Sequence, residues 1–320
     1  MKRALIAGLA LSLLGTTIPS ANATFPGRNG RIVVHSSPLT GGDWVYRSIP
    51  RDGSRAALFP FGGDAARLSP DDRWVVFGQD GNLWRQYLPE EDPLQLTTDG
   101  QSGYASWSPD SQHLVFSRQE TSPGLGPRIS LFSMNSDGSS QTPLTSEAFD
   151  FLPVWSPDAT RVAFVRCLSY RFSVPSVVVF GQRFDPVSGC EDPSDIFIWD
   201  MEGQITQLTS SPESESDPDW SPDSRKLAFS CDVDREAETG KGGVCILNLR
   251  TERVRVIYRS RNRGFDPSWS PNGKRLAFVV VPRNEEDTDS EIYTIRTDGS
   301  SLRRVTRNHR EDMEPQWLAR

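Results

Sequence analysis

Four carboxylates stand shortly before tryptophans that recur along the chain. Asp217, Asp266 and Glu314 each begin an acid-Pro-x-Trp sequence, and Asp150 lies close to the same position ahead of a fourth tryptophan. If these side chains converge, they form a partial acidic ring that attracts a cation or a basic peptide segment. The alternative is that they only stabilise local turns, in which Asp is common. We predict that Asp150, Asp217, Asp266 and Glu314 form a partner-binding site.

Other candidates for catalysis or metal binding are few. The sequence has no Gly-x-Ser-x-Gly or His-Glu-x-x-His motif and no phosphate-binding glycine loop. Asp232, Asp234 and Glu236 alternate like the start of a calcium-binding loop, but Ala237 takes the place of the required glycine. A solvated hairpin tip is the alternative. We therefore predict no catalytic residue, no metal site and no cofactor. The histidines are far apart in the sequence: His35, His113 and His309.

The four cysteines are expected to form two disulfides if the chain is exported. Cys167 and Cys190 flank one insertion, and Cys231 and Cys245 flank another. Local pairing within each couple would close two protruding hairpins. A zinc site is not predicted, because no Cys-x-x-Cys pair and no nearby histidine accompany them.

The first residues have the pattern of an export signal. Two basic residues come first, an apolar run covers residues 4–14, and a cleavage site of small residues ends at Ala23. We predict that residues 1–23 are a signal peptide, that the mature chain begins at Thr24, and that the protein is periplasmic or secreted. A buried N-terminal helix is the alternative. The apolar run is too short to span a membrane, which takes about 20 residues.

The charge of the chain excludes one class of partner. Its formal net charge is −7 at pH 7, and its Lys and Arg residues do not form the long basic cluster that is typical of nucleic-acid binding. We therefore expect no nucleic-acid partner. No later segment is apolar enough to span a membrane. The tryptophan repeats are spread evenly along the chain, so we expect one domain over residues 24–320, and we expect the protein to be monomeric.

One motif recurs five times and predicts the architecture. It is a Trp/Leu-Ser-Pro-Asp/Asn turn followed by an apolar strand that ends in Phe, at 68–77, 107–116, 155–164, 220–229 and 269–278. A unit that repeats at this period must stack on its neighbours to bury its apolar faces. Only one copy has a glycine after the Asp or Asn, namely Gly273. The other turns are expected either to be of type I or to contain some strain.

Each copy reads as four short antiparallel strands. In the last copy these are expected at 267–269, 276–279, 291–295 and 302–306, with a hairpin turn at Asp298-Gly299. A first unit near residues 30–53 lacks its own Trp strand, and Pro315-Gln316-Trp317 at the end of the chain can supply one. We therefore predict an all-β, six-bladed β-propeller of four-stranded blades, closed by the C-terminal strand joining the N-terminal blade.

The block Pro-x-Trp-Ser-Pro-Asp, with Asp-Gly and Leu-Thr further on, resembles the repeats of TolB-type propellers, a WD-like group found in exported bacterial proteins. The resemblance covers about residues 26–320. It does not include the α/β domain that precedes the TolB propeller, so we expect the propeller portion alone. The resemblance implies that the channel mouth is a docking surface for a protein or peptide partner, such as an envelope component.

Two functions follow for testing. The first is an exported, non-catalytic scaffold that binds a protein or peptide at the channel mouth. The alternative is a carbohydrate-active lyase or hydrolase that uses channel carboxylates, with or without a divalent metal.

Overall fold

The computed structural model describes residues 22–23, 25–38, 44–50, 57–58, 63–88, 92–122, 126–146, 149–171, 177–179, 182–184, 189–190, 193–232, 242–260, 262–282 and 289–319. Within these ranges every regular element is a β-strand, so the predicted all-β class is confirmed. The described residues contain no helix that would reach across a membrane.

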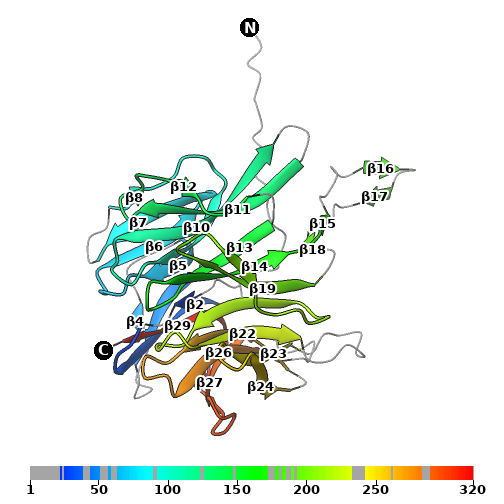
Figure 1. The fold of residues 1–320 in the computed structure, drawn as a ribbon. Helices are drawn as coiled ribbons and strands as arrows, with labels where there is room; N and C mark the ends of the chain where they lie inside the picture. The colour runs from blue at the N-terminus through cyan, green and yellow to red at the C-terminus, as the bar shows by residue number, and fades with distance from the viewer. Residues whose placement is uncertain are drawn as a thin grey trace.

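The strands form a series of antiparallel sheets (Figure 1). Two four-stranded sheets contain β5 (Asp64–Leu68), β6 (Trp74–Gln79), β7 (Asn82–Tyr87) and β8 (Leu94–Gln95), and β25 (Arg263–Trp269), β26 (Arg275–Val281), β27 (Glu291–Arg296) and β28 (Arg303–Arg304). A five-stranded sheet contains β1 (Asn22–Ala23), β21 (Glu215–Trp220), β22 (Lys226–Asp232), β23 (Gly242–Asn248) and β24 (Arg253–Arg259).

An eight-stranded sheet joins two further units. The first contains β9 (Ser102–Trp107), β10 (His113–Ser122), β11 (Gly126–Asn135) and β12 (Thr142–Pro143), and the second contains β13 (Phe149–Trp155), β14 (Arg161–Cys167), β19 (Ser194–Asp200) and β20 (Ile205–Gln207). A parallel contact between β11 and β13 connects them. Two small ribbons pair β15 (Tyr170–Arg171) with β18 (Gly189–Cys190) and β16 (Val177–Val179) with β17 (Gln182–Phe184).

The two ends of the chain share one sheet. It contains β29 (Arg310–Ala319), β2 (Asn29–Pro38), β3 (Val45–Ile49) and β4 (Ala57–Leu58), in that order. In Figure 1 the red β29 lies beside the blue β2, and the register pairs Asn29 with Ala319 and Pro38 with Arg310. A buried hydrogen bond from Ser36 Oγ to Asp312 Oδ1 (2.7 Å) adds to the backbone pairing.

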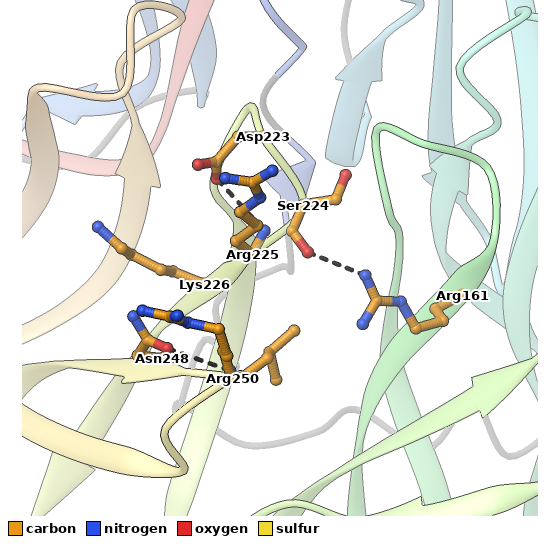
Figure 2. Close-up of a pocket in the computed structure, with 8 residues that line it drawn as sticks. Arg161, Asp223, Ser224, Arg225, Lys226, Asn248 and Arg250 are labelled. Carbon is orange, nitrogen blue, oxygen red and sulfur yellow. Dashed lines mark hydrogen bonds between the residues drawn. The ribbon is translucent and has the colours of Figure 1, made fainter.

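The repeated Ser-Pro-Asp turn is a small hydrogen-bonded unit. In the copy shown in Figure 2, Asp223 Oδ1 accepts hydrogen bonds from Ser221 Oγ (2.6 Å) and from the backbone N–H of Arg225 (3.3 Å). Ser221 Oγ in turn accepts from the N–H of Lys226 (2.9 Å). Serine, proline and aspartate recur together because each supplies one part of this turn: an acceptor, a preset φ and a second acceptor.

All five turns place the residue after the Asp or Asn at positive φ. The angles are 58° at Asp72, 60° at Ser111, 60° at Ala159, 55° at Ser224 and 68° at Gly273. Only glycine adopts this conformation without a steric cost. The sequence left open an ordinary type I turn or strain. Each turn has the backbone hydrogen bond of a β-turn, such as Ser224 N–H to the carbonyl of Ser221 at 2.8 Å, and the four turns that lack glycine also contain strain at the residue after the Asp.

The strands that carry the Trp or Leu of the motif are linked to one another. We call β5, β9, β13, β21, β25 and β29 the motif strands. Three indole N–H groups donate to a carbonyl of the preceding motif strand: Trp107 to Arg67 (3.0 Å), Trp220 to Val154 (3.1 Å) and Trp269 to Asp219 (3.1 Å). Four backbone N–H groups donate to a side chain of the neighbouring motif strand: Trp155 to Ser106 (3.1 Å), Trp269 to Asp219 (2.5 Å), Trp317 to Ser268 (3.1 Å) and Leu68 to Gln316 (3.3 Å).

Candidate functional site

Each motif strand contains a β-bulge at one equivalent position. The bulged residue has positive φ in all six strands: Ala65 (50°), Tyr104 (51°), Leu152 (53°), Asp217 (53°), Asp266 (54°) and Glu314 (50°). Such a conformation costs about 1–3 kcal/mol for a non-glycine residue, and such strain is concentrated at functional sites. Three consecutive motif strands, β21, β25 and β29, place a carboxylate at this position.

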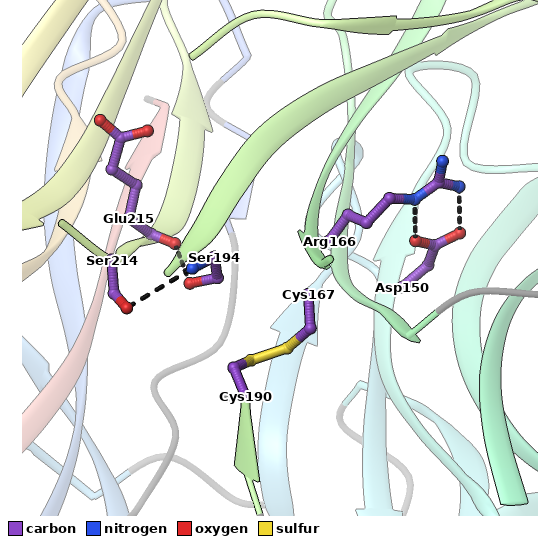
Figure 3. The surroundings of a disulfide bond; sticks show 7 residues. All are labelled: Asp150, Arg166, Cys167, Cys190, Ser194, Ser214 and Glu215. Atoms are coloured by element: carbon purple, nitrogen blue, oxygen red, sulfur yellow. Dashed lines mark hydrogen bonds and ion pairs between the residues drawn. A yellow bond between two sulfur atoms is a disulfide. The ribbon is translucent and has the colours of Figure 1, made fainter. Parts of the chain in front are cut away.

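Asp150 does not belong to this set. The bulged residue of its strand is Leu152, and Asp150 lies two positions earlier. Its carboxylate is fully buried and forms a two-pronged ion pair with Arg166, with Nε–Oδ1 at 2.6 Å and Nη2–Oδ2 at 2.8 Å (Figure 3). The negative charge of Asp150 is therefore neutralised by Arg166 within one sheet, across β13 and β14.

Asp217, Asp266 and Glu314 are buried rather than displayed at a surface. Their relative exposures are 1%, 1% and 9%. Asp217 Oδ2 accepts hydrogen bonds from Ser230 Oγ (2.6 Å) and Ser216 Oγ (2.9 Å), and Ser230 Oγ accepts from the backbone N–H of Asp266 (2.9 Å). Ser230 on β22 therefore connects the bulges of β21 and β25.

Asp266 is the least satisfied member of the acidic cluster formed by Asp217, Asp266 and Glu314. Both of its carboxylate oxygens are buried and have no hydrogen-bond partner among the described residues. Burial raises its pKa well above the ordinary value, and the negative charge of Asp217 raises it further. Burial likewise raises the pKa of Asp217 to about 6, against the opposing effect of its serine hydrogen bonds. Both carboxyl groups therefore hold protons more tightly than an exposed aspartate does.

A buried arginine and a buried tyrosine contact the third acid. Arg67 Nη1 lies 3.7 Å from Glu314 Oε2, and the hydroxyl of Tyr46 donates to the same oxygen at 3.4 Å. Arg67 is the residue just before Leu68 in the motif, where the other copies have Ser106, Val154, Asp219, Ser268 and Gln316. A basic residue at this position in a single copy was the sequence signal that would have identified Arg67.

Negative charges from several motif strands act on Tyr104 of β9. Burial raises the pKa of Tyr104 to about 12, and the charges of Glu314, Asp64 and Asp217 contribute to the same shift. These acids come from β29, β5 and β21, so three motif strands direct negative charge toward the tyrosine of a fourth. Within the described ranges no group of three or more His, Cys, Asp or Glu side chains could hold a metal ion.

An extended segment of the same chain lies beside the acidic cluster. β1 pairs in parallel with β21, with Asn22 opposite Asp219 and Ala23 opposite Trp220, and it also lies against β9, β13 and β25. Residues 1–21 of the predicted signal peptide, and Thr24, lie outside the described residues. Two residues of extended chain, Asn22 and Ala23, therefore pair with β21 just after the bulge at Asp217.

The predicted disulfide pairing is confirmed. Cys167 is joined to Cys190 and Cys231 to Cys245, with Cα–Cα distances of 5.5 Å and 6.0 Å, and the described chain has no free cysteine. The first bridge follows directly on Arg166, the partner of Asp150 (Figure 3). In the calcium-like sequence, Asp232 ends β22, while Asp234 and Glu236 lie outside the described residues.

Comparison with known proteins agrees with the repeat analysis. Residues 195–319 match the family described as TolB beta propeller domain, so the predicted resemblance to TolB-type propellers is confirmed there. The structure of TolB from Acinetobacter baumannii is similar, with a TM-score of 0.69 and 16% identity, over 91% of this chain and 67% of that chain. No curated protein sequence matches the chain.

Two other solved structures share the fold. An oligogalacturonate lyase in complex with manganese has a TM-score of 0.57 and 16% identity, over 92% of this chain and 86% of that one. A chain of a nidogen/laminin complex has a TM-score of 0.64 and 10% identity, over 90% of this chain and 98% of that one. The common feature is the β-propeller, a fold that hosts both binding proteins and enzymes.

Proposed function

We propose that this protein is an exported, non-catalytic β-propeller scaffold that binds an extended, positively charged peptide segment of a partner protein among its motif strands. The observation that carries the proposal is the position of β1. It pairs with Asp219 and Trp220 of β21, immediately after the bulge that holds Asp217.

The proposed ring has six blades closed by β29. Hydrogen bonds between motif strands run from β5 to β9, β13, β21, β25 and β29, and the bond from Leu68 N–H to Gln316 Oε1 returns from β29 to β5. Each motif strand then belongs to one blade, with β29 serving the blade of β2, β3 and β4. In a closed ring each motif strand is held by a neighbouring motif strand on both sides. This fixes the side chains at the centre of the ring for binding a partner.

The chemistry of the site favours a cationic peptide. β-strand addition supplies backbone hydrogen bonds without regard to sequence, and specificity then comes from the side chains nearby. Here those side chains are Asp217, Asp266 and Glu314, and the buried Asp266 carboxylate gains hydrogen bonds when a lysine, arginine or terminal ammonium is placed beside it. The similarity to a chain of the nidogen/laminin complex supports a role in protein binding.

The proposed location is the periplasm or the outside of the cell. Two disulfides are expected to persist only in an oxidising compartment. The signal pattern over residues 1–23 supports export. If it is removed after Ala23, the position beside Asp219 and Trp220 that β1 occupies is opened to another extended chain.

The test compares partner capture by matched variants of the mature protein. The site variant carries Asp217→Asn, Asp266→Asn and Glu314→Gln, and the control carries Asp137→Asn, Glu202→Gln and Asp298→Asn at exposed hairpin turns. Both remove the same charge. After crosslinking in a native cell envelope, we expect the control to capture the same partner as the wild type and the site variant to lose it. Equal capture by both variants would reject the acidic cluster as the binding site.

Raised pKa values favour one alternative, a carboxylate-based lyase or hydrolase. Burial raises the pKa of Glu215 to about 7, and it lies two residues from Asp217 on β21. A carboxyl group that titrates near neutral pH suits general acid–base catalysis. Incubation with oligogalacturonate, with and without Mn²⁺, tests this function. Turnover that Glu215→Gln abolishes would support the enzyme and count against the scaffold.

A further inference from the structure

A cavity of about 810 Å³ lies at the turn end of two neighbouring units (Figure 2). It is built from the start of β14, the Ser-Pro-Asp turn between β21 and β22, and the turn after β23. Its polar lining includes Arg161, Asp223, Arg225, Lys226, Asn248 and Arg250, beside Ser224. None of the acidic cluster residues lines it. We propose that this cavity binds a small molecule with two or more oxyanion groups, phosphate or carboxylate.

The lining is strongly basic in a protein of net charge −7. Four cationic side chains face one carboxylate, Asp223, whose Oδ1 already accepts from Ser221 and from the backbone of Arg225. The side chains of Arg225, Lys226 and Arg250 form no ion pair or hydrogen bond within the described part of the chain. Among the described residues no ion pair compensates these positive charges, and an anion in the cavity would be attracted to all three.

Arg161 and Asn248 are held in place on either side. Arg161 Nη2 donates to the carbonyl of Ser224 at 2.9 Å, and its guanidinium lies over the ring of Trp220, 4.9 Å from the centroid. Asn248 Oδ1 accepts the N–H groups of Arg250 and Thr251, both at 3.1 Å. The amide nitrogen of Asn248 is thus left as a donor. Fixed donors reduce the conformational entropy that a bound ligand must overcome.

The repeats of the chain itself show that this basic turn is exceptional. A hydrogen bond from Leu249 N–H to the carbonyl of Arg225 (3.1 Å) is repeated in other units by Ser136 with Gln112 (2.8 Å) and by Thr297 with Lys274 (3.2 Å). In this alignment Arg250 occupies the position of Asp137, Glu202 and Asp298. Position 250 therefore carries a positive charge where these three counterparts carry a negative charge. In the last unit the corresponding acid forms an ion pair, Arg296 Nε–Asp298 Oδ2 at 3.5 Å.

The geometry of the donors determines the class of ligand. Guanidinium groups match the paired oxygens of phosphate and carboxylate, and several of them around one cavity favour a ligand with more than one such group. The half-buried Leu249, which packs against the core, adds an apolar wall. The cavity volume falls within the range of about 300–1,000 Å³ that small-ligand sites occupy.

Isothermal titration of the mature protein with pyrophosphate and, separately, with citrate tests the proposal, with sodium chloride at matched ionic strength as the blank. The test variants are Arg250→Asp, which restores the charge found in the other repeats, and Arg225→Gln, which copies Gln112. The control is Lys274→Gln, the residue equivalent to Arg225 in the next unit. Arg225 and Arg250 are exposed, so folding should be unaffected, and circular dichroism checks this.

We expect saturable binding of at least one probe, weakened about tenfold or more by Arg250→Asp and by Arg225→Gln. Lys274→Gln should bind as the wild type does. Binding of pyrophosphate alone assigns a phosphate ligand, and binding of citrate alone assigns a carboxylate ligand. Absence of binding by both probes overturns the proposal, as does equal weakening by the test and control variants.

Discussion

The pH dependence of stability is the sharpest measure of whether Asp217 is buried as described. Its pKa rises from 3.8 to about 6 in the folded protein, chiefly through burial. A carboxyl group whose pKa is raised by folding contributes stability below the pKa of the unfolded chain, and this contribution is lost as the pH rises through the folded pKa. Asp217→Asn removes the ionisation, so the variant should gain stability over the wild type as the pH increases.

The size of this gain in stability follows from the change in the pKa of Asp217 on folding. About two pKa units correspond to about 3 kcal/mol at pH 8, where both states of the wild type are ionised. At pH 4.5 the unfolded state alone is largely ionised, and the corresponding penalty is about 1 kcal/mol. The amide oxygen introduced by Asp217→Asn can still accept from Ser230 and Ser216, as the carboxylate of Asp217 does. The advantage of the variant should therefore be about 2 kcal/mol larger at pH 8 than at pH 4.5.

Urea unfolding of the wild type and the variant at both pH values measures this difference. Asp150→Asn is the matched control, because Asp150 is equally buried but is paired with Arg166. Breaking that pair should destabilise the protein at both pH values, by up to about 3 kcal/mol. If the advantage of Asp217→Asn is the same at pH 4.5 and pH 8, Asp217 does not titrate in this range and the reasoning on the acidic cluster is refuted.

Three further predictions concern the framework. Ala159 and Gly273 both have positive φ, which only glycine adopts without strain. Ala159→Gly should therefore stabilise the protein by about 1 kcal/mol in thermal unfolding, and Gly273→Ala should destabilise it by a similar amount. A change of stability in the same direction for both variants would contradict this. Replacing Cys231 and Cys245 by alanine should cost about 2–4 kcal/mol in urea, and no loss would argue against the bridge. Trp317→Ala should lower the free energy of unfolding by about 3–5 kcal/mol. An unchanged melting temperature would mean that β29 does not stabilise the sheet of β2, β3 and β4.

The repeated turn was readable from the sequence because its chemistry is local. Ser221, Asp223 and their counterparts act within five residues of one another, so the motif itself records the contacts. The disulfide pairing was readable for a similar reason, since each pair of cysteines brackets one hairpin. The pairing of β29 with β2 was predictable because the first unit lacks a Trp strand and the residues around Trp317 match one.

The candidate site was predicted less completely from the sequence than the turns, the disulfides and the strand pairing were. Counting back three residues from each motif Trp reaches Asp217, Asp266 and Glu314, and the same count from Trp155 reaches Leu152 rather than Asp150. The sequence showed this offset, but it did not show that Asp150 pairs with Arg166 instead of joining the other three acids. The burial of the acids was not readable, because it depends on neighbouring sheets that are distant in the sequence. The approach of Arg67 to Glu314 is likewise a product of packing between β5 and β29.

The pairing of β2 with β29 also determines how the molecule responds to tension. Asn29 is opposite Ala319, so both chain ends leave the sheet at the same end of the pair. A pulling force applied to the two ends loads the hydrogen bonds one after another, as in opening a zipper, instead of shearing them all together. Under such a load the pair of β2 and β29 separates from the end at Asn29 and Ala319, one hydrogen bond at a time.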